Sequence, residues 1–175
     1  MAKEVASDLY ASASSSIAGE LRRVGRVNAN VIDLLADNPV LRDHANEEAH
    51  LEIFTNVLLK NPLYYGIYLG AGDGGFFEVI NLNTSEAARK KLHALPTDRW
   101  LIITVRPGEN GGVRHYRYLD ENLQVRLSRS EPTDFDVHSR PWYLSASASD
   151  DVQYTEPYIF AQLGAPGRTL SKRLR

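Results

Sequence analysis

The chain has 175 residues, of which 43% are hydrophobic and 24% are charged, with a formal net charge of -2 and no cysteine. A chain of this length buries about 70% of the surface it exposes when unfolded, so it can hold a core without disulfides or a structural metal. The lack of cysteine excludes thiolate catalysis and cysteine-ligated metal clusters. Near-neutral charge argues against general nucleic-acid binding. No apolar run approaches the roughly 18 residues of a membrane span, so we expect this stretch itself not to cross a membrane.

The first third of the chain predicts two helices. The first carries one stripe of residues spaced alternately four and three apart, namely Ile17, Leu21, Val24, Asn28, Val31 and Leu35. This stripe could lie against the domain's own sheet, or it could meet a second copy as a short heptad seam with Asn28 setting the register. Asn38-Pro39 ends the first helix, because the residue before proline is disfavoured in helical geometry. A second helix is predicted from about Asn46 to Lys60.

From Leu63 onward, aromatic and β-branched runs separated by short turns predict antiparallel strands. The predicted strands are Tyr64 to Leu69, Phe76 to Leu82, Trp100 to Arg106, Val113 to Leu119, Leu123 to Arg129 and Val152 to Phe160. A short helix capped by Ser85 separates the second strand from the third. The predicted fold is therefore α+β, with a long N-terminal helix packed on a mostly antiparallel sheet. We expect residues 1–61 to form the helical part and residues 62–175 the ligand-binding lobe.

The segment GAGDGG at residues 70–75 matches the GxGxxG pattern of dinucleotide-binding loops. A dinucleotide site requires a helix directly after these glycines, because the pyrophosphate binds at the helix N-terminus. The following residues, FFEVI, predict a strand instead. We therefore predict a hairpin turn at this segment, consistent with the turn preferences of Asp-Gly and Gly-Gly.

Asp134, Asp136 and His138 alternate along the chain, so an extended segment would point all three side chains the same way, as a metal-dependent hydrolase could use. The alternative is a polar loop whose Asp side chains bond to their own backbone. The chain has no GxSxG, HExxH or phosphate-binding GxxxxGK[ST] motif. We therefore expect no catalytic residues, no metal and no cofactor.

The segment FDVHSRPWYLSA, residues 135–146, suits recognition of a small acidic ligand. Arg140 offers a planar fork of donors that matches a carboxylate, and Trp142 and Tyr143 offer flat apolar walls with polar edges. Alternatively, Arg140 forms an internal salt bridge with Asp134 or Asp136, while Trp142 belongs to the core. The residues alone leave both interpretations open.

The run FDVHSRPWY, followed about ten residues later by YTEPY, resembles the D-x-R-x-RPWY…Y-[ST]-[DE]-P-Y signature of double Cache sensor domains. The hairpin IYLG…DGGFFEV is similar to sensors that precede nucleotide cyclase or phosphodiesterase modules. The resemblance covers most of the chain from about Ile17. It implies a PAS-like, dimeric sensor domain on the extracytoplasmic (periplasmic) face of the bacterial inner membrane, in a membrane-anchored receptor. It also implies that Arg140 and Trp142 hold a carboxylate.

Four departures separate this chain from the family pattern. His138 replaces the first arginine of the signature, and Phe135 stands where the amino-acid-binding subset has tyrosine. The aspartate with which that subset binds the ligand's amine would lie beyond Arg175, and the family continues through further strands into a second lobe. Carboxylate recognition therefore carries over, whereas amine recognition does not. The chain is either a truncated piece or one with another arrangement of strands.

These observations predict a sensor that binds a small polar ligand, carboxylate-like or amino-acid-like, and relays binding to an output domain outside this chain. That domain could be a histidine kinase, a nucleotide cyclase, a cyclic-dinucleotide enzyme or a chemoreceptor. We expect a homodimer through the N-terminal helix and no nucleic-acid partner. The predicted ligand-binding residues are Arg140, Trp142, Tyr143, Tyr158, Tyr116, Tyr118, Phe135 and Asp136. The alternatives are a ligand-free dimerisation module and the metal-dependent hydrolase described above.

Overall fold

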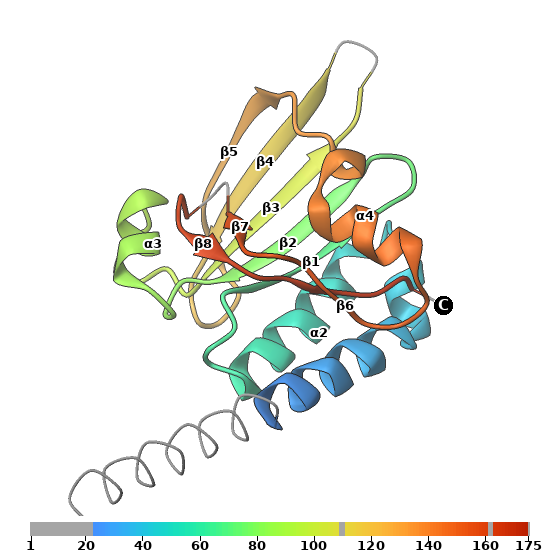
Figure 1. The fold of residues 1–175 in the computed structure, drawn as a ribbon. Coiled ribbons are helices and arrows are strands. Elements are labelled where there is room, and N and C mark those ends of the chain that lie inside the picture. Colours follow the sequence, from blue (N-terminus) through green and yellow to red (C-terminus); the bar gives the residue numbers. More distant parts are fainter. Residues whose placement is uncertain (1–22, 109–110, 161–162, 175) are drawn as a thin grey trace, which may run out of the picture.

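The computed structural model describes residues 23–108, 111–160 and 163–174 (Figure 1). Residues 23–36 form the first described helix, and the predicted stripe positions Ile17 and Leu21 lie outside the described residues. A 3-10 turn, η1 (Pro39–Arg42), follows, and the amide oxygen of its N-cap Asn38 accepts a hydrogen bond from the Val40 N–H. Helix α2 (Glu47–Lys60), with Asn46 as its N-cap, lies within one residue of the predicted range.

Five strands form one antiparallel sheet in the order β1-β2-β3-β4-β5, which is also their order along the chain. They are β1 (Gly66–Gly70), β2 (Phe76–Asn81), β3 (Trp100–Arg106), β4 (Gly112–Leu119) and β5 (Val125–Thr133). Each neighbouring pair is antiparallel. The predicted α+β class is confirmed, and each of these strands lies within a few residues of its predicted range.

The glycine-rich segment after β1 is a hairpin turn, as predicted. The Ala71 N–H donates to the Gly75 carbonyl over 2.8 Å, and Gly74 adopts a positive φ of 92° that favours glycine. The short helix α3 (Glu86–Lys91) lies between β2 and β3, and the Ser85 hydroxyl accepts a hydrogen bond from the Ala88 N–H.

The chain after β5 does not add a strand to the central sheet. It forms the 3-10 turn η2 (Val137–Ser139), helix α4 (Pro141–Ala148) and four two-residue strands, β6 (Gln153–Tyr154), β7 (Tyr158–Ile159), β8 (Pro166–Gly167) and β9 (Leu170–Ser171). β6 pairs with β9, and β7 pairs with β8. The predicted continuous strand from Val152 to Phe160 is therefore wrong. Pro157 lies between β6 and β7, where it has no N–H to donate to a ladder.

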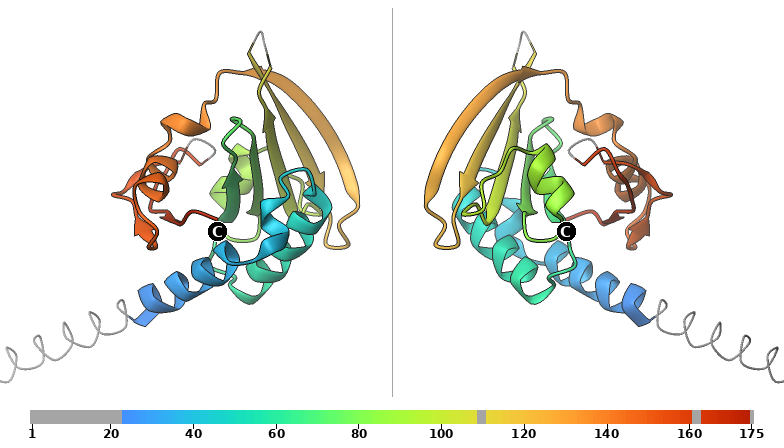
Figure 2. Two further views of the ribbon diagram at one scale, coloured as in Figure 1. Left: turned by 90° about the vertical axis from the view of Figure 1, so that its right-hand side faces the viewer. Right: turned by 90° about the vertical axis from the view of Figure 1, so that its left-hand side faces the viewer.

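Figure 2 shows α2 on one face of the sheet and α4 with the segment after it on the other face. A hydrophobic cluster lies at each face. On one face, α2 contributes Phe54 and Leu58, which pack against Val79 and Ile102 of the sheet. On the other face, α4 and the segment after it cover a second cluster, to which Trp142 belongs. The candidate site lies in this second layer.

The described part of the first helix packs on its own domain through half of its predicted stripe. Asn28 accepts a hydrogen bond from the Tyr64 hydroxyl over 2.6 Å, and Leu35 packs against the α2-side cluster. Val24, from the predicted stripe, is exposed together with Val27 and Leu34, and the three side chains are 42%, 46% and 76% accessible. Within the described ranges, no helix is both long enough and apolar enough to cross a membrane.

Candidate functional site

A small cavity of about 50 Å³ lies between the central sheet and the segment that follows β5. Its lining contains seven aromatic side chains, one carboxyl group and one guanidinium group. The lining residues are Tyr65, Tyr68, Phe76, Glu78, Phe135, Arg140, Trp142, Tyr158 and Phe160. Four of these are residues that the sequence predicts to bind ligand, namely Phe135, Arg140, Trp142 and Tyr158. Their role in binding stays a prediction.

Trp142 closes one side of the cavity because α4 packs closely on β1. Its indole ring lies 4.8 Å from the Tyr68 ring, centroid to centroid, and 6.2 Å from the Phe76 ring. The close approach depends on Gly70, which has no side chain at the point where the indole meets the strand. Gly70 therefore serves packing of the RPWY segment rather than phosphate binding.

Glu78 supplies the carboxyl group of the cavity from the middle of β2. It lies opposite Tyr68 of β1 and Ile103 of β3, and only 6% of its surface is accessible. Gly66 lies beside it on β1, where a Cβ would lie 2.9 Å from the Val79 carbonyl oxygen. No hydrogen bond or ion pair to Glu78 is present within the described part of the chain. Burial raises the pKa of Glu78 to about 8, although the positive charge of Arg114 acts to lower it.

Arg140 supplies the guanidinium group at the junction between η2 and α4. Its Cζ lies 5.6 Å from the centroid of the Phe135 ring, as does the Cζ of Arg114. Among the described residues, Arg140 makes no side-chain hydrogen bond or ion pair, so the predicted alternative of a salt bridge to Asp134 or Asp136 is not formed. A guanidinium that borders a cavity without a partner keeps its donors available for an anion.

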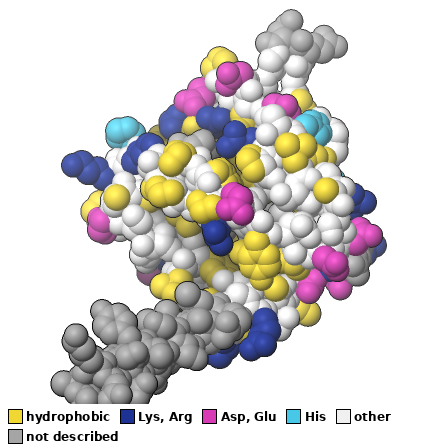
Figure 3. Space-filling view, viewed as in Figure 1, with side chains coloured by type: hydrophobic (Ala, Val, Ile, Leu, Met, Phe, Trp, Pro, Cys, Tyr) yellow, Lys and Arg dark blue, Asp and Glu magenta, His cyan; other side chains and the backbone are white. Residues whose placement is uncertain are grey.

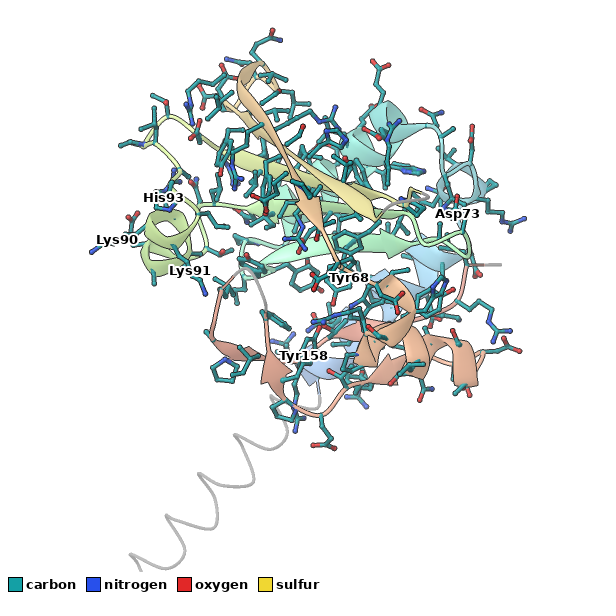
Figure 4. All side chains as sticks on the ribbon, turned by 90° about the horizontal axis from the view of Figure 1, so that it is seen from above. Tyr68, Asp73, Lys90, Lys91, His93 and Tyr158 are labelled. Atoms are coloured by element: carbon teal, nitrogen blue, oxygen red, sulfur yellow. The ribbon has the colours of Figure 1, made fainter. Side chains whose placement is uncertain are left out.

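Two tyrosines and a threonine join the C-terminal segment to the sheet beside the cavity. Tyr158 and Thr169 share a hydrogen bond of 2.8 Å between their hydroxyl oxygens, and the Tyr68 hydroxyl also bonds to Thr169. Figure 4 shows Tyr68 on the sheet and Tyr158 on the covering segment. Burial raises the pKa of Tyr68 well above its ordinary value, so this hydroxyl stays protonated and able to donate.

The other predicted site residues lie outside the cavity. Tyr143 faces a neighbouring groove and contacts the His138 ring edge-on at 5.1 Å. The Tyr116 hydroxyl donates to Glu131, and the buried Tyr118 hydroxyl donates to the Leu92 carbonyl. We predicted that Arg140, Trp142 and Tyr143 border one pocket, with Tyr116, Tyr118 or Tyr158 across from them. Arg140, Trp142 and Tyr158 line the same cavity, whereas Tyr143, Tyr116 and Tyr118 are not among its lining residues. Whether any of these residues binds a ligand stays a prediction.

The Asp134, Asp136 and His138 set does not form the extended arrangement that a metal site would need. Residues 137–139 form the turn η2, so the three side chains do not share one face of a strand. Asp136 instead caps this turn, accepting a hydrogen bond from the His138 N–H over 3.0 Å. Within the residues that the structure describes, no three His, Asp or Glu side chains are grouped to hold a metal ion.

Sequence reasoning missed five lining residues of the cavity, among them those on its sheet side. The missed residues are Tyr65, Tyr68, Phe76, Glu78 and Phe160. Glu78 carries a signal that could have been used, because it is the one charged residue in the run FFEVI, and every position of β2 is buried. A carboxyl in a fully buried strand is rarely left without a functional or structural partner.

Comparison with known proteins finds one that is similar to this chain over part of its length. The chain is 31% identical over 123 residues to a Rhizobium meliloti (strain 1021) protein named adenylate cyclase 1. The match covers 67% of this chain and 18% of that protein, so the chain spans less than a fifth of the relative's length. No family model matches the chain. No solved structure matches it either.

Proposed function

We propose that this chain is the ligand-binding part of a double Cache-like sensor, which binds a small carboxylate-bearing ligand in the cavity beside Arg140. The unpartnered guanidinium of Arg140 is the observation that carries this proposal. An arginine that served only packing would be expected to satisfy its donors on neighbouring carboxylates or carbonyls, because an unpaired charged group at the edge of a core is costly. Aspartates are close along the chain, yet Arg140 bonds to neither.

The size of the cavity limits the ligand. One buried water needs about 10 to 15 Å³ of such space. A cavity of about 50 Å³ therefore holds a ligand of about four or five heavy atoms. Acetate and glycine are of this size.

The proposed signal route runs through the segment that covers the cavity. Tyr158 and Thr169 border or support the cavity, and β9 follows Thr169 directly. Lys172, next after β9, forms an ion pair with Asp33 of the first described helix. A ligand that changes the position of Tyr158 would therefore act on this helix through a few residues, provided that it binds two arrangements with different affinities.

The partial relative supports a place within a signalling protein. Its matching segment makes up 18% of a protein named as a cyclase, a share that suits an accessory module. We therefore propose nucleotide cyclase as the output to examine first. We also propose that this chain has no catalytic activity of its own, that its parent is membrane-anchored with this part extracytoplasmic, and that two copies associate through the first helix.

A thermal-shift screen tests the binding proposal. Acetate, formate, propionate and glycine are added to the wild-type chain and to Arg140→Gln. A ligand at 100 times its dissociation constant stabilises the chain by about 2.7 kcal/mol, which is several degrees in a chain of this size. We expect a shift in the wild type and none in Arg140→Gln. Arg129→Gln, which removes a guanidinium on β5 outside the cavity, should retain the shift.

Hydrogen exchange tests the signal route. With a ligand from the screen, protection should rise across residues 153–171 and change along residues 23–36. Lys172→Ala should remove the change in the helix while leaving protection at the cavity. Protection that stays confined to the cavity in the wild type would show binding without transmission.

A further inference from the structure

An acidic group and a basic group face the same cavity without pairing to each other. Glu78 enters from β2 and Arg140 from the start of α4, and no ion pair joins them in the described part of the chain. A buried carboxyl without hydrogen bonds costs folding free energy, and the core around Glu78 could hold an apolar side chain instead. An unpaired carboxyl group and an unpaired guanidinium group on one cavity indicate a ligand that pairs with both.

The aromatic lining favours a cation near Glu78. Seven aromatic rings border the cavity, and they pack against one another closely, with centroids 4.9 Å apart for Phe76 and Phe135 and 5.0 Å apart for Tyr158 and Phe160. Ring faces carry negative potential, which attracts an ammonium group, and the attraction is stronger when water is excluded. An acidic group within a set of aromatic faces is therefore a favourable environment for an ammonium ion.

We propose that Glu78 is the counter-ion of an ammonium group, so that the ligand of this cavity is a small zwitterion bound at its carboxylate by Arg140 and at its ammonium by Glu78. This inference rests on the function proposed above for Arg140. It assigns the cationic end to a residue that lies outside the RPWY signature. The cavity volume of about 50 Å³ matches a ligand of the size of glycine.

Ligand binding should release a proton from Glu78. The neutral carboxylic acid predominates at pH 7 in the empty cavity, because burial raises its pKa to about 8. The other titratable and charged groups that face it are Arg114 on β4, Arg140, and the hydroxyls of Tyr65, Tyr68 and Tyr158. Burial raises the pKa of Tyr65 and of Tyr68, so these two hydroxyls stay neutral. An ammonium beside Glu78 stabilises the carboxylate, so the O–H proton passes to solvent as the ammonium–carboxylate pair forms.

Calorimetry with matched ligands tests this inference. Acetate, methylammonium and glycine represent the carboxylate alone, the ammonium alone and both together. We expect glycine to bind wild type at least tenfold more tightly than acetate at pH 7. Glycine titrations in phosphate and in Tris, which differ in heat of ionisation, should reveal release of close to one proton per ligand, whereas acetate should release none.

Two variants separate this inference from the function on which it rests. Glu78→Gln should bind acetate as the wild type does, lose the tenfold preference for glycine and release no proton. Glu156→Gln, which neutralises an exposed carboxylate outside the cavity, should behave as the wild type. If glycine binds no more tightly than acetate, or Glu78→Gln leaves the preference unchanged, the zwitterion inference is overturned and carboxylate binding by Arg140 stands. If neither acetate nor glycine binds the wild type, the proposed function and this inference fall together.

Discussion

The indole ring of Trp142 occupies the space that a side chain on Gly70 would need: a Cβ at Gly70 would lie 2.6 Å from Trp142 Cη2 and 2.5 Å from Val137 Cγ2. Both neighbours belong to the segment that closes the cavity. The Gly70→Ala variant should therefore displace η2 and α4 from the sheet and lower the free energy of unfolding by about 1 to 3 kcal/mol, the usual range for overpacking. Denaturant unfolding measures the loss.

Gly72→Ala is the matched control, because a Cβ at Gly72 meets no atom within 4 Å. It should change the stability by no more than about 0.5 kcal/mol. Tryptophan fluorescence should also distinguish the variants, since Trp142 becomes more exposed only in Gly70→Ala. Equal stability of the two variants would contradict the close packing of α4 on β1.

Glu78 should make the unliganded fold less stable as the pH rises. The pKa of Glu78 is about 8 in the folded chain and 4.5 in the unfolded chain, so the unfolded state loses this proton first. Its contribution to stability is complete below pH 4.5 and is lost as the pH rises to about 8, by on the order of 5 kcal/mol. Unfolding of wild type and Glu78→Gln from pH 5 to pH 9 tests this, and the variant should lack the decline.

His50 should make the fold less stable as the pH falls, the opposite dependence from that of Glu78. Its ring is buried on α2 against Phe54 and Phe77, and this burial lowers the pKa of His50 below 6.5. The unfolded state therefore binds a proton before the folded state does, and stability falls as the pH decreases from 6.5 through the lowered folded-state pKa. His50→Leu should flatten this acid limb, whereas the same change at the exposed His44 should leave it in place.

Substitution of Asp98, in the loop that leads into β3, should lower the stability of the fold. It is 1% exposed and accepts two hydrogen bonds from Arg126, of 2.6 and 2.7 Å, and one from the Leu95 N–H. Burial acts to raise the pKa of Asp98, but these hydrogen bonds outweigh it and lower the pKa. Asp98→Ala should cost about 3 kcal/mol, because it leaves the loop N–H and the guanidinium without their acceptor. Glu131→Ala, at a more exposed pair, should cost about 1 kcal/mol or less.

The exposed stripe of the first helix should mediate self-association. Val24, Val27 and Leu34 are three and seven residues apart, a spacing that places them on one face of a helix. Sedimentation of the wild-type chain should show a dimer that dissociates at low concentration. Leu34→Glu should shift the equilibrium to monomer without changing unfolding, because 76% of this side chain is exposed.

Leu144→Glu controls for the loss of an exposed leucine and the added charge. It makes the same change on α4, at a side chain that is 57% exposed and lies outside the stripe, so it should leave the dimer in place. A wild-type chain that remains monomeric at high concentration would contradict this prediction.

The sequence predicted the central sheet well because its signals are local. Trp100 to Arg106 is bounded by turn residues and was predicted to the residue, and Ser85 caps α3 as expected. The cavity depends on contacts between distant segments, which single-sequence patterns do not encode. Glu78 and Trp142 are 64 positions apart, and nothing in the run FFEVI shows which segment will cover it.

The tyrosines of β4 illustrate the same limit. Tyr116 and Tyr118 lie on the same sheet face as the cavity and belong to the same core cluster as Trp142. Their hydroxyls are nevertheless taken by Glu131 and by the Leu92 carbonyl. Residue type and strand face could be predicted from the sequence. The hydrogen bonds that occupy these two hydroxyls, and so keep them from a ligand, could not.

Figure 3 shows hydrophobic side chains of the covering segment interspersed with basic and acidic side chains.

Because the five sheet strands pair in chain order, each hairpin can form as soon as its second strand has been synthesised. The sheet can therefore assemble before residues 134–174 emerge. At that stage the face of β2 that carries Phe76 and Glu78 would be open to solvent. The carboxylate of Glu78 would then be hydrated and ionised, and it would interrupt an otherwise apolar surface. Glu78 would therefore act as a gatekeeper against strand aggregation during synthesis and lose its charge only when α4 closes over it.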